Sequence, residues 1–494
     1  MQNRDQIQTD RPTEIGRIPA SPHRDPRTDP PRGIDGGAGV AAQQTTTPSG
    51  YVVPPRERHP EPRTAFSRTS ESGRSSARNS RSSKTERIII VGGGPGGLVL
   101  AALLRALGYE VLVLESSPSY GSELHVVDDR SFNLTIDGLG MHAAGPLSRL
   151  IYATGLLIDG RAIHRPSKPM LTHPYGHAAS DHFVAVSRTD LLVALTQHLC
   201  VDWDCPVRFG CKVTSADAKT GELNWHDTTT GENHQGFADL IVFADGVGGL
   251  GREKAFKKAG VSAKKESDPT AYLKAEIKPD AAKQCGIPLD KINFWPGEGG
   301  VSIGVPNVNG SVSVLVMGEL PGAFESPVFT NPTDAMRFMR SRNPLLLDAI
   351  PDLGNQLVNR KSGNFATTEV STWRLGPRAV LLGDAGRCAP PWAGLGANSA
   401  LSDADALVTA LTEHRDLDEA LVTYSAGRVA ASAIIQRLIV GHGRLLNVSL
   451  GSWPWRLLHG IQDLRERMFD TRTLYQRIAF DKGGLDREIR ESHN

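Results

Sequence analysis

The sequence contains no run of about 18 or more consecutive apolar residues, the length that a membrane-spanning helix needs, and no signal-peptide pattern. Its five cysteines form neither a Cys-x-x-Cys pair nor a disulfide-like framework, and no metal-ligand cluster is apparent. The net charge of +1 gives no support for nucleic-acid binding by the folded part. We therefore expect a cytoplasmic protein without metal, nucleic-acid partner or transmembrane segment; the oligomeric state is not readable.

The first 86 residues also lack leucine, tryptophan and cysteine, and are rich in Arg, Pro, Ser, Thr and Gly. Such a composition buries too little apolar surface to offset the entropy lost on ordering. Fifteen Lys and Arg against ten Asp and Glu make residues 1–87 mildly basic, but Asp5, Asp10 and Glu14 argue against a transit peptide. We predict that residues 1–86 form a disordered basic tail.

A glycine-rich turn follows the first apolar run of the remaining chain. Residues 88–91 read as a buried strand and 98–107 as a helix, with Gly92-Gly93-Gly94-Pro95-Gly96-Gly97 between them. Gly92 permits a tight turn, Gly94 leaves room for a pyrophosphate, and Gly97 lets the helix pack closely on the strand. The free N–H groups and dipole of that helix favour phosphate. The motif therefore predicts a dinucleotide site.

Three further features extend this site. Residues 111–114 read as a second strand that ends at Glu115, at about the spacing of an acid that binds an adenosine ribose. Residues 239–244 form an apolar run that ends in Asp245-Gly246, with Arg252 seven residues after the aspartate. Residues 379–382 lead to Gly383-Asp384, where a carboxylate can accept a hydrogen bond from a sugar-like hydroxyl chain. Together the ordered motifs predict FAD.

The loop after the third motif supports a flavin in particular. Residues 390–398, Pro-Pro-Trp-Ala-Gly-Leu-Gly-Ala-Asn, open a predicted helix that runs to about Leu411. A glycine-rich loop lets a flat ring lie against backbone, and the positive end of the helix stabilises negative charge on a reduced flavin. We expect Gly396, Ala397 and Asn398 to bind the cofactor.

From about Arg87 to Phe480, the order of these motifs resembles the single-component FAD-dependent aromatic hydroxylases of the para-hydroxybenzoate hydroxylase group. The resemblance implies an α/β fold: a Rossmann-like FAD-binding domain interrupted by a β-sheet substrate domain, with a C-terminal helical region. The predicted division is a tail (1–86), three FAD-binding parts (87–165, 183–260 and 366–425), two substrate-domain parts (166–182 and 261–365) and C-terminal helices (426–494).

The same resemblance implies roles for individual residues. Glu115 would bind the adenosine ribose and Asp384 the ribityl chain. Asp245 and Gly246 would lie near both FAD and the nicotinamide cofactor. Arg188, at the head of the predicted helix 189–199, matches an FAD-contacting arginine of the group. Arg130 is expected to bind the cofactor as well.

The middle of the chain resembles the kynurenine 3-monooxygenases. The resemblance rests on residues 130–134 (Arg-Ser-Phe-Asn-Leu), 161–164 (Arg-Ala-Ile-His), 174–176 (Pro-Tyr-Gly), 294–296 (Phe-Trp-Pro), 305–307 (Val-Pro-Asn) and 310–311 (Gly-Ser). It implies that Arg161 and Tyr175 hold a substrate carboxylate, since a guanidinium and a hydroxyl are both suitable donors. Tyr475 matches a late substrate-contact tyrosine. The alternative to this carboxylate-binding role is that Arg161 is solvated and Tyr175 packs in the core.

Several positions depart from that family. Arg387 stands where the family motif has histidine, Leu395 where it often has glutamine, and His442 near the place of a substrate-contact asparagine. The loop 390–394 looks closer to flavin hydroxylases that inactivate tetracyclines. The hydrophobic C-terminal anchor of the eukaryotic kynurenine enzymes is not found in residues 481–494.

We therefore expect a flavoprotein monooxygenase with FAD as cofactor, NADPH or NADH and O2 as cosubstrates, and a small aromatic substrate. By resemblance, oxygen reaches the ring through a C4a-hydroperoxyflavin, and the protein positions the substrate and excludes water. The first choice of substrate is L-kynurenine or a kynurenine-like aryl amino acid. No catalytic side chain is assigned; His164 and His442 are candidate proton acceptors.

Other functions stay open. One alternative is a tailoring hydroxylase or epoxidase of a quinolone, terpenoid or tetracycline-like compound, which has no need of Arg161. Another is a flavin-dependent halogenase, suggested only by Trp453-Pro454-Trp455, and a third is a non-catalytic flavin-binding protein. The helical pattern of residues 427–468 predicts a cap on the substrate pocket, with peripheral membrane contact through Trp453 and Trp455 as the alternative.

Overall fold

A computed structural model describes residues 86–120, 122, 132–176, 178, 181–298, 300–318, 320, 327–447 and 473–491 of the chain. Arg130, the tail up to residue 85, Trp453 and Trp455 lie outside the described residues. None of the helices in these ranges has both the length and the apolar character that a membrane crossing needs.

The first layer of the fold is a six-stranded sheet that is parallel except at one edge, where β18 and β19 run antiparallel. Its central strands are continuous apolar runs, as expected for strands covered on both faces. The strand order is β18 (Arg374–Gly376), β19 (Ala379–Leu381), β12 (Leu240–Phe243), β1 (Arg87–Val91), β2 (Glu110–Leu114) and β8 (Val207–Arg208).

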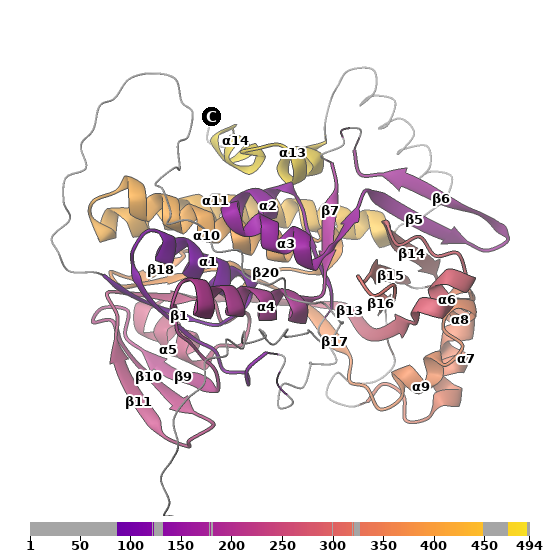
Figure 1. Ribbon diagram of the computed structural model, residues 1–494, viewed down its shortest axis with the longest axis horizontal. Helices are drawn as coiled ribbons and strands as arrows, with labels where there is room; N and C mark the ends of the chain where they lie inside the picture. The colour runs from indigo at the N-terminus through magenta and orange to yellow at the C-terminus, as the bar shows by residue number, and fades with distance from the viewer. Residues whose placement is uncertain are drawn as a thin grey trace, which may run out of the picture. The chain divides into compact units, whose positions relative to one another are not determined.

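Helices cover this sheet, and the longest lie next to each other in Figure 1. Helix α1 contacts α10 and α4, and α10 in turn contacts α11 and α2. The helices of this part are α1 (Pro95–Ala106), α2 (Gly138–Ala143), α3 (Ser148–Thr154), α4 (Arg188–Gln197), α5 (Leu250–Ala259), α10 (Leu395–Glu413) and α11 (Leu417–Asn447), with short turns η1 (Gly145–Leu147), η2 (His198–Asp202), η3 (Gly383–Ala385) and η4 (Pro391–Ala393).

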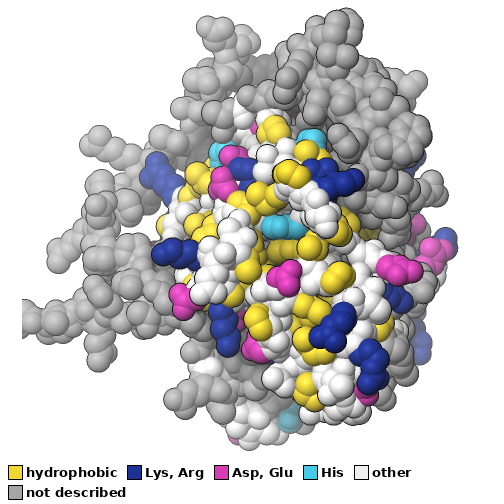
Figure 2. Space-filling view, turned by 90° about the vertical axis from the view of Figure 1, so that its right-hand side faces the viewer, with side chains coloured by type: hydrophobic (Ala, Val, Ile, Leu, Met, Phe, Trp, Pro, Cys, Tyr) yellow, Lys and Arg dark blue, Asp and Glu magenta, His cyan; other side chains and the backbone are white. Residues whose placement is uncertain are grey.

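The second layer is an eight-stranded sheet, antiparallel except for the β14–β5 pair. Helices α6–α9 lie beside it, and on the face that carries them apolar and charged side chains are intermingled (Figure 2). The strand order is β20 (Arg387–Cys388), β17 (Gly363–Val370), β13 (Ala263–Ile277), β16 (Val312–Gly318), β15 (Gly300–Pro306), β14 (Lys291–Gly297), β5 (Gly160–Arg165) and β6 (Lys168–Pro174); the helices are α6 (Pro279–Gln284), α7 (Pro332–Arg342), α8 (Pro344–Ala349) and α9 (Leu353–Leu357).

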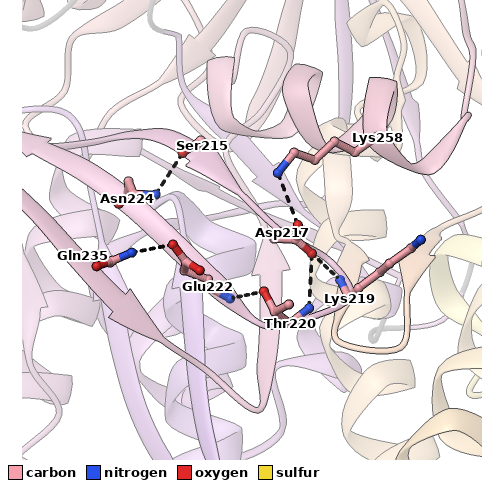
Figure 3. Close-up of polar contacts among 8 residues, drawn as sticks. All are labelled: Ser215, Asp217, Lys219, Thr220, Glu222, Asn224, Gln235 and Lys258. Atoms are coloured by element: carbon pink, nitrogen blue, oxygen red, sulfur yellow. Dashed lines mark hydrogen bonds and ion pairs between the residues drawn. The ribbon is translucent and has the colours of Figure 1, made fainter.

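A small antiparallel sheet of β9 (Cys211–Ala216), β10 (Glu222–Asp227) and β11 (Asn233–Phe237) uses the same turn twice. In the first turn, drawn in Figure 3, Asp217 Oδ1 accepts hydrogen bonds from the N–H groups of Lys219 and Thr220, and Lys258 binds Oδ2. In the second turn, Asp227 Oδ1 likewise accepts hydrogen bonds from the N–H groups of Thr229 and Thr230. Local side-chain bonding of this kind sets the hairpin register.

The last sheet, β3 (Leu134–Ile136), β7 (Phe183–Val186) and β4 (Leu156–Ile158), packs near the end of the described chain. Two short helices, α13 (Leu474–Phe480) and α14 (Gly484–Glu491), complete the C-terminal region. Phe480 stacks on Phe183 at 5.5 Å between ring centroids, which joins α13 to β7.

The predicted fold class is confirmed: a Rossmann-type α/β layer, a sheet-based second layer and C-terminal helices. The strands after which the three motifs were expected are β1, β12 and β19. Strands β5 and β20 belong to the eight-stranded sheet, although the predicted division gave their residues to the FAD-binding parts. The domain boundaries themselves stay a prediction.

Close packing of α1 on the sheet generates a stability prediction. A Cβ atom at Gly97 would lie 2.2 Å from the carbonyl oxygen of Gly92, so Gly97→Ala must push the helix off the strand. We expect a loss of about 1–3 kcal/mol in the free energy of unfolding, measured by urea denaturation. Gly427→Ala is the control, because no atom lies within 4 Å of its added methyl group in α11. That variant should be about 0.5–1 kcal/mol more stable than the wild type, and equal stabilities of the two variants would contradict the argument.

Candidate functional site

The first glycine turn leaves an open cradle between β1 and α1. Gly92 has φ +109°, and a Cβ atom there would lie 2.4 Å from the carbonyl oxygen of Ala244, so the position requires glycine. A Cβ atom at Gly94 would meet nothing within 4 Å, because that residue faces a cavity. Helix α1 begins at once with Pro95, and the N–H groups of a first helical turn have no partner within the helix, which favours an anion at this end.

Glu115 follows β2 and is held by backbone donors. Its Oε2 accepts a hydrogen bond from the N–H of Gly93 at 2.6 Å, and its Oε1 accepts one from Ser117 at 2.8 Å. Tyr120 closes the same corner, since its hydroxyl donates to the carbonyl oxygen of Gly93 at 2.9 Å. The sequence reading missed Tyr120, which carries no motif of its own. The carboxylate is thus fixed at the cavity wall.

Arg252 joins the second motif to the third. Its Nη1 lies 3.6 Å from Asp245 Oδ1 and donates to the carbonyl oxygen of Ala385 at 3.1 Å, and it also bonds the carbonyl oxygen of Gly246. The guanidinium is buried, and burial raises the pKa of Asp245 to about 6 although Arg252 opposes the rise. A substitution at Arg252 would therefore disturb two motifs together.

Asp384 presents a carboxylate to the cavity from the third motif. It is surrounded by protein, and burial raises its pKa, while the charges of Arg387 and Arg188 oppose that rise. Its side chain is nevertheless accessible from the cavity and has no hydrogen-bond partner among the described residues. Arg188, the first residue of α4, lines the same wall. A hydroxyl-bearing chain and a phosphate would each find a partner here.

One cavity of about 820 Å³ brings most of the predicted residues together. Gly97 lies behind the turn, and Asn398 does not line the cavity: its amide donates to the carbonyl oxygens of Thr135 and Gly394 and accepts from the N–H of Asp137. Contact of either with a cofactor stays a prediction. The predicted residues on the wall are Gly92, Gly94, Glu115, Arg161, Tyr175, Arg188, Asp245, Gly246, Asp384, Gly396, Ala397 and Tyr475.

This cavity fits an FAD molecule by its chemistry. Its wall includes the open turn at Gly94, the fixed Glu115, the accessible Asp384 and the first turn of α10 at Gly396 and Ala397. Gly394 has φ +66°, and a Cβ atom at Gly396 would meet nothing within 4 Å, so bare backbone faces the cavity where a ring could lie. When bound, the flavin supplies the redox chemistry that no protein side chain can.

The other end of the cavity is apolar and aromatic, with one cation. The guanidinium carbon of Arg161, on β5, lies 5.0 Å from the centroid of the Tyr175 ring. Arg161 has no carboxylate partner among the described residues, and its Nε makes no hydrogen bond. Burial raises the pKa of Tyr175 to about 12, so its hydroxyl stays protonated. The wall also includes Phe132, Tyr272, Phe294, Met317, Phe365 and Trp392.

Helix α13 contacts residues at both ends of the cavity. The Tyr475 hydroxyl donates to the carbonyl oxygen of Ala393 at 3.3 Å, and Gln476 Nε2 donates to the carbonyl oxygen of Tyr175 at 3.1 Å. Thr473 and Gln476 form a capping box that starts the helix at this point. The Thr-x-x-Gln spacing was a readable signal that the sequence reading missed.

The two histidine candidates differ. His164 does not line the cavity: its Nε2 lies 2.9 Å from Asn293 Oδ1, and its ring stacks on Trp295 at 4.5 Å. Burial lowers its pKa. These contacts indicate that His164 has a structural role. The side chain of His442 lies outside the described residues.

Comparison with known proteins agrees with this geometry. Residues 85–437 match the family model described as FAD binding domain. The chain belongs to this family and is a flavoprotein hydroxylase that binds FAD.

Among the relatives, the kynurenine 3-monooxygenase of Salinispora tropica is 30% identical over 347 residues, which cover 70% of this chain and 77% of the relative. The solved 2-methyl-3-hydroxypyridine-5-carboxylic acid oxygenase has the same fold, with a TM-score of 0.60 at 21% identity, covering 75% of this chain and 94% of that chain. A variant of Klebsiella pneumoniae HpxO complexed with FAD gives a TM-score of 0.59 at 20% identity, with 82% and 97% covered.

A buried acid beside α13 generates a prediction of pH dependence. Asp137 is 1% exposed; its Oδ1 caps α2 by accepting from the N–H of Gly140, while Oδ2 has no hydrogen-bond partner. Burial raises its pKa from 3.8 to about 7. The folded protein thus keeps a proton that the unfolded chain releases near pH 4. The free energy of unfolding should therefore fall between about pH 4 and pH 7, by on the order of 1.4 kcal/mol per unit of pKa difference.

Asp137→Asn should remove this contribution, because asparagine still caps the helix and carries no charge. Relative to the wild type, the variant should gain stability as the pH rises from 5 to 8 in urea denaturation. Asp217→Asn is a control for which the opposite pH dependence is expected. Backbone N–H groups lower the pKa of Asp217, so loss of its carboxylate should reduce the free energy of unfolding more at pH 8 than at pH 3. Parallel pH profiles of wild type and Asp137→Asn would refute the prediction.

Proposed function

We propose that the protein hydroxylates L-kynurenine or a kynurenine-like aryl amino acid, with NADPH or NADH and O2 as cosubstrates. The observation that carries the proposal is the lone guanidinium of Arg161 beside Tyr175, at the aromatic end of a cavity that fits FAD. The name of the Salinispora tropica relative supports the same substrate class.

The chemistry of the wall suits an aromatic amino acid. A half-buried arginine without a carboxylate of its own is best satisfied by a carboxylate of the substrate, and a protonated tyrosine hydroxyl offers a second donor. The aromatic residues around them accept an aryl ring. With the carboxylate held at Arg161, the ring of the substrate would extend toward the wall formed by Gly394 and Gly396.

The protein side chains would then bind the substrate, orient its ring and shield it from water. Trp392 and Tyr475 line the cavity, and we expect them to shield the reacting atoms, because an oxygen-transfer reaction needs a site from which water is excluded. Among the described residues that line the cavity there is no histidine, so proton transfer by histidine is not part of the proposal. A cytoplasmic location and the choice between NADPH and NADH stay predictions.

The test measures substrate-stimulated oxidation of NADPH and NADH by the purified holoenzyme, with mass spectrometry of the product. L-kynurenine should give a product heavier by one oxygen, and anthranilate, salicylate and quinolones should stimulate far less. Stimulation by a quinolone, terpenoid or tetracycline instead of L-kynurenine would favour the tailoring hydroxylase. Oxidation unaltered by every compound would favour a non-catalytic flavin protein.

Arg161→Ala should reduce kcat/KM for L-kynurenine by about 10–150-fold, since a hydrogen bond to a charged group contributes about 1.5–3 kcal/mol. Arg165→Ala is the matched control: Arg165 lies on the same strand, does not line the cavity, and donates to the carbonyl oxygen of Pro169 instead. Its kcat/KM should stay near that of the wild type. Equal effects of the two substitutions would exclude the carboxylate clamp.

A further inference from the structure

A buried arginine stands behind the wall where the flavin ring is expected. Arg387, on β20, is 3% exposed and does not line the cavity. Its Nη2 donates to Ser399 Oγ, and Ser399 Oγ donates to the carbonyl oxygen of Gly396 at 3.0 Å. Two hydrogen bonds therefore connect the guanidinium to the first turn of α10, whose backbone faces the cavity.

The charge of Arg387 has no close partner. Among the described residues no carboxylate forms an ion pair with it, and its Nε makes no hydrogen bond. The charge of Arg387 acts on two acids: Asp403, which is buried, and Asp384, which is accessible from the cavity. Asp403 is already paired with Arg428 at 3.2 Å, whereas Asp384, on the cavity wall, forms no ion pair among the described residues and is influenced by Arg188 and Arg252 as well as by Arg387.

The positive charge of Arg387 acts electrostatically on groups at the other side of the cavity wall. A unit charge in a protein interior interacts more strongly with its surroundings than in water, because little solvent screens it. The N-terminus of α10 already contributes a partial positive charge at Gly396 and Ala397. Arg387 adds a full positive charge behind the same turn.

We propose that Arg387 is a positioning residue whose buried charge raises the reduction potential of the bound flavin. Hydride transfer from the nicotinamide delivers two electrons and one proton, so the flavin gains one negative charge while the nicotinamide ring becomes cationic. A fixed positive charge behind the ring stabilises that negative charge. The proposal rests on the flavin lying at this wall, as in the proposed function, and does not depend on the substrate.

The test is the two-electron midpoint potential of the holoenzyme, measured by reduction in the presence of a reference dye. Arg387→Gln should shift the potential to more negative values, and Arg387→Lys, which keeps the charge, should restore most of it. Ser399→Ala removes a hydrogen bond and keeps the charge, so its shift should be smaller than that of Arg387→Gln. Arg105→Gln is the control: Arg105 is a half-buried arginine near the end of α1 that bonds the carbonyl oxygen of Trp203, and its loss should leave the potential unchanged.

The outcomes distinguish an effect of the charge of Arg387 on the midpoint potential from an effect of altered local structure. An unchanged potential in Arg387→Gln, or equal shifts in Arg387→Gln, Arg387→Lys and Ser399→Ala, would overturn the proposal. Arg387→Met provides a second neutral variant of similar length if the glutamine variant does not fold. The affinity of the oxidised flavin for sulfite, an anionic probe, should fall in the same order as the potential. Failure of the wild type to bind flavin would instead refute the site itself, and failure to turn over L-kynurenine would refute only the substrate.

Discussion

The parallel register of four buried strands is the constraint on which the site depends. Val91, the last residue of β1, pairs with Leu114 and with Phe243, and Phe243 pairs with Leu381. All four strands therefore end at the same edge of the sheet, and the residues that follow them meet there. Glu115, Asp245 and Asp384 are separated by more than a hundred residues of sequence and yet line one cavity.

Bringing these acids to one edge has an electrostatic cost that arginines offset. Asp245 faces Arg252, Asp403 faces Arg428, and the more distant charges of Arg387, Arg188 and Arg252 act on Asp384. Charges taken out of water are tolerated in proteins when they are paired and hydrogen-bonded. Asp384 lines the cavity and forms no ion pair among the described residues, which leaves its carboxylate available to a ligand.

The sequence predicted the parts of the fold that local patterns specify. Apolar β-branched runs located β1, β2, β12 and β19 to within a residue or two, because strands buried on both faces have a composition that few other elements share. Glycines with a steric reason were also read correctly: Gly92 needs its positive φ, and Gly97 its missing side chain.

The remaining parts depend on contacts between distant segments. Asn398 was read as a cofactor residue from its place in the loop, but its amide is used by the backbone of Thr135, Asp137 and Gly394, which no spacing along the chain reveals. Strand β5 joins the second sheet through a parallel pairing with β14, more than a hundred residues away. Tyr120 has no motif, and only the fold brings its hydroxyl to Gly93.

Helix α13 shows how the end of the described chain completes a site that begins with β1. The Tyr475 hydroxyl donates to the carbonyl oxygen of Ala393, Gln476 donates to the carbonyl oxygen of Tyr175, and Phe480 stacks on Phe183. These three contacts span 82 to 301 residues of sequence, so they form only once both sheets are in place. Because one short helix contacts Tyr175 and Ala393 at once, the packing of α13 fixes both of these parts of the cavity wall.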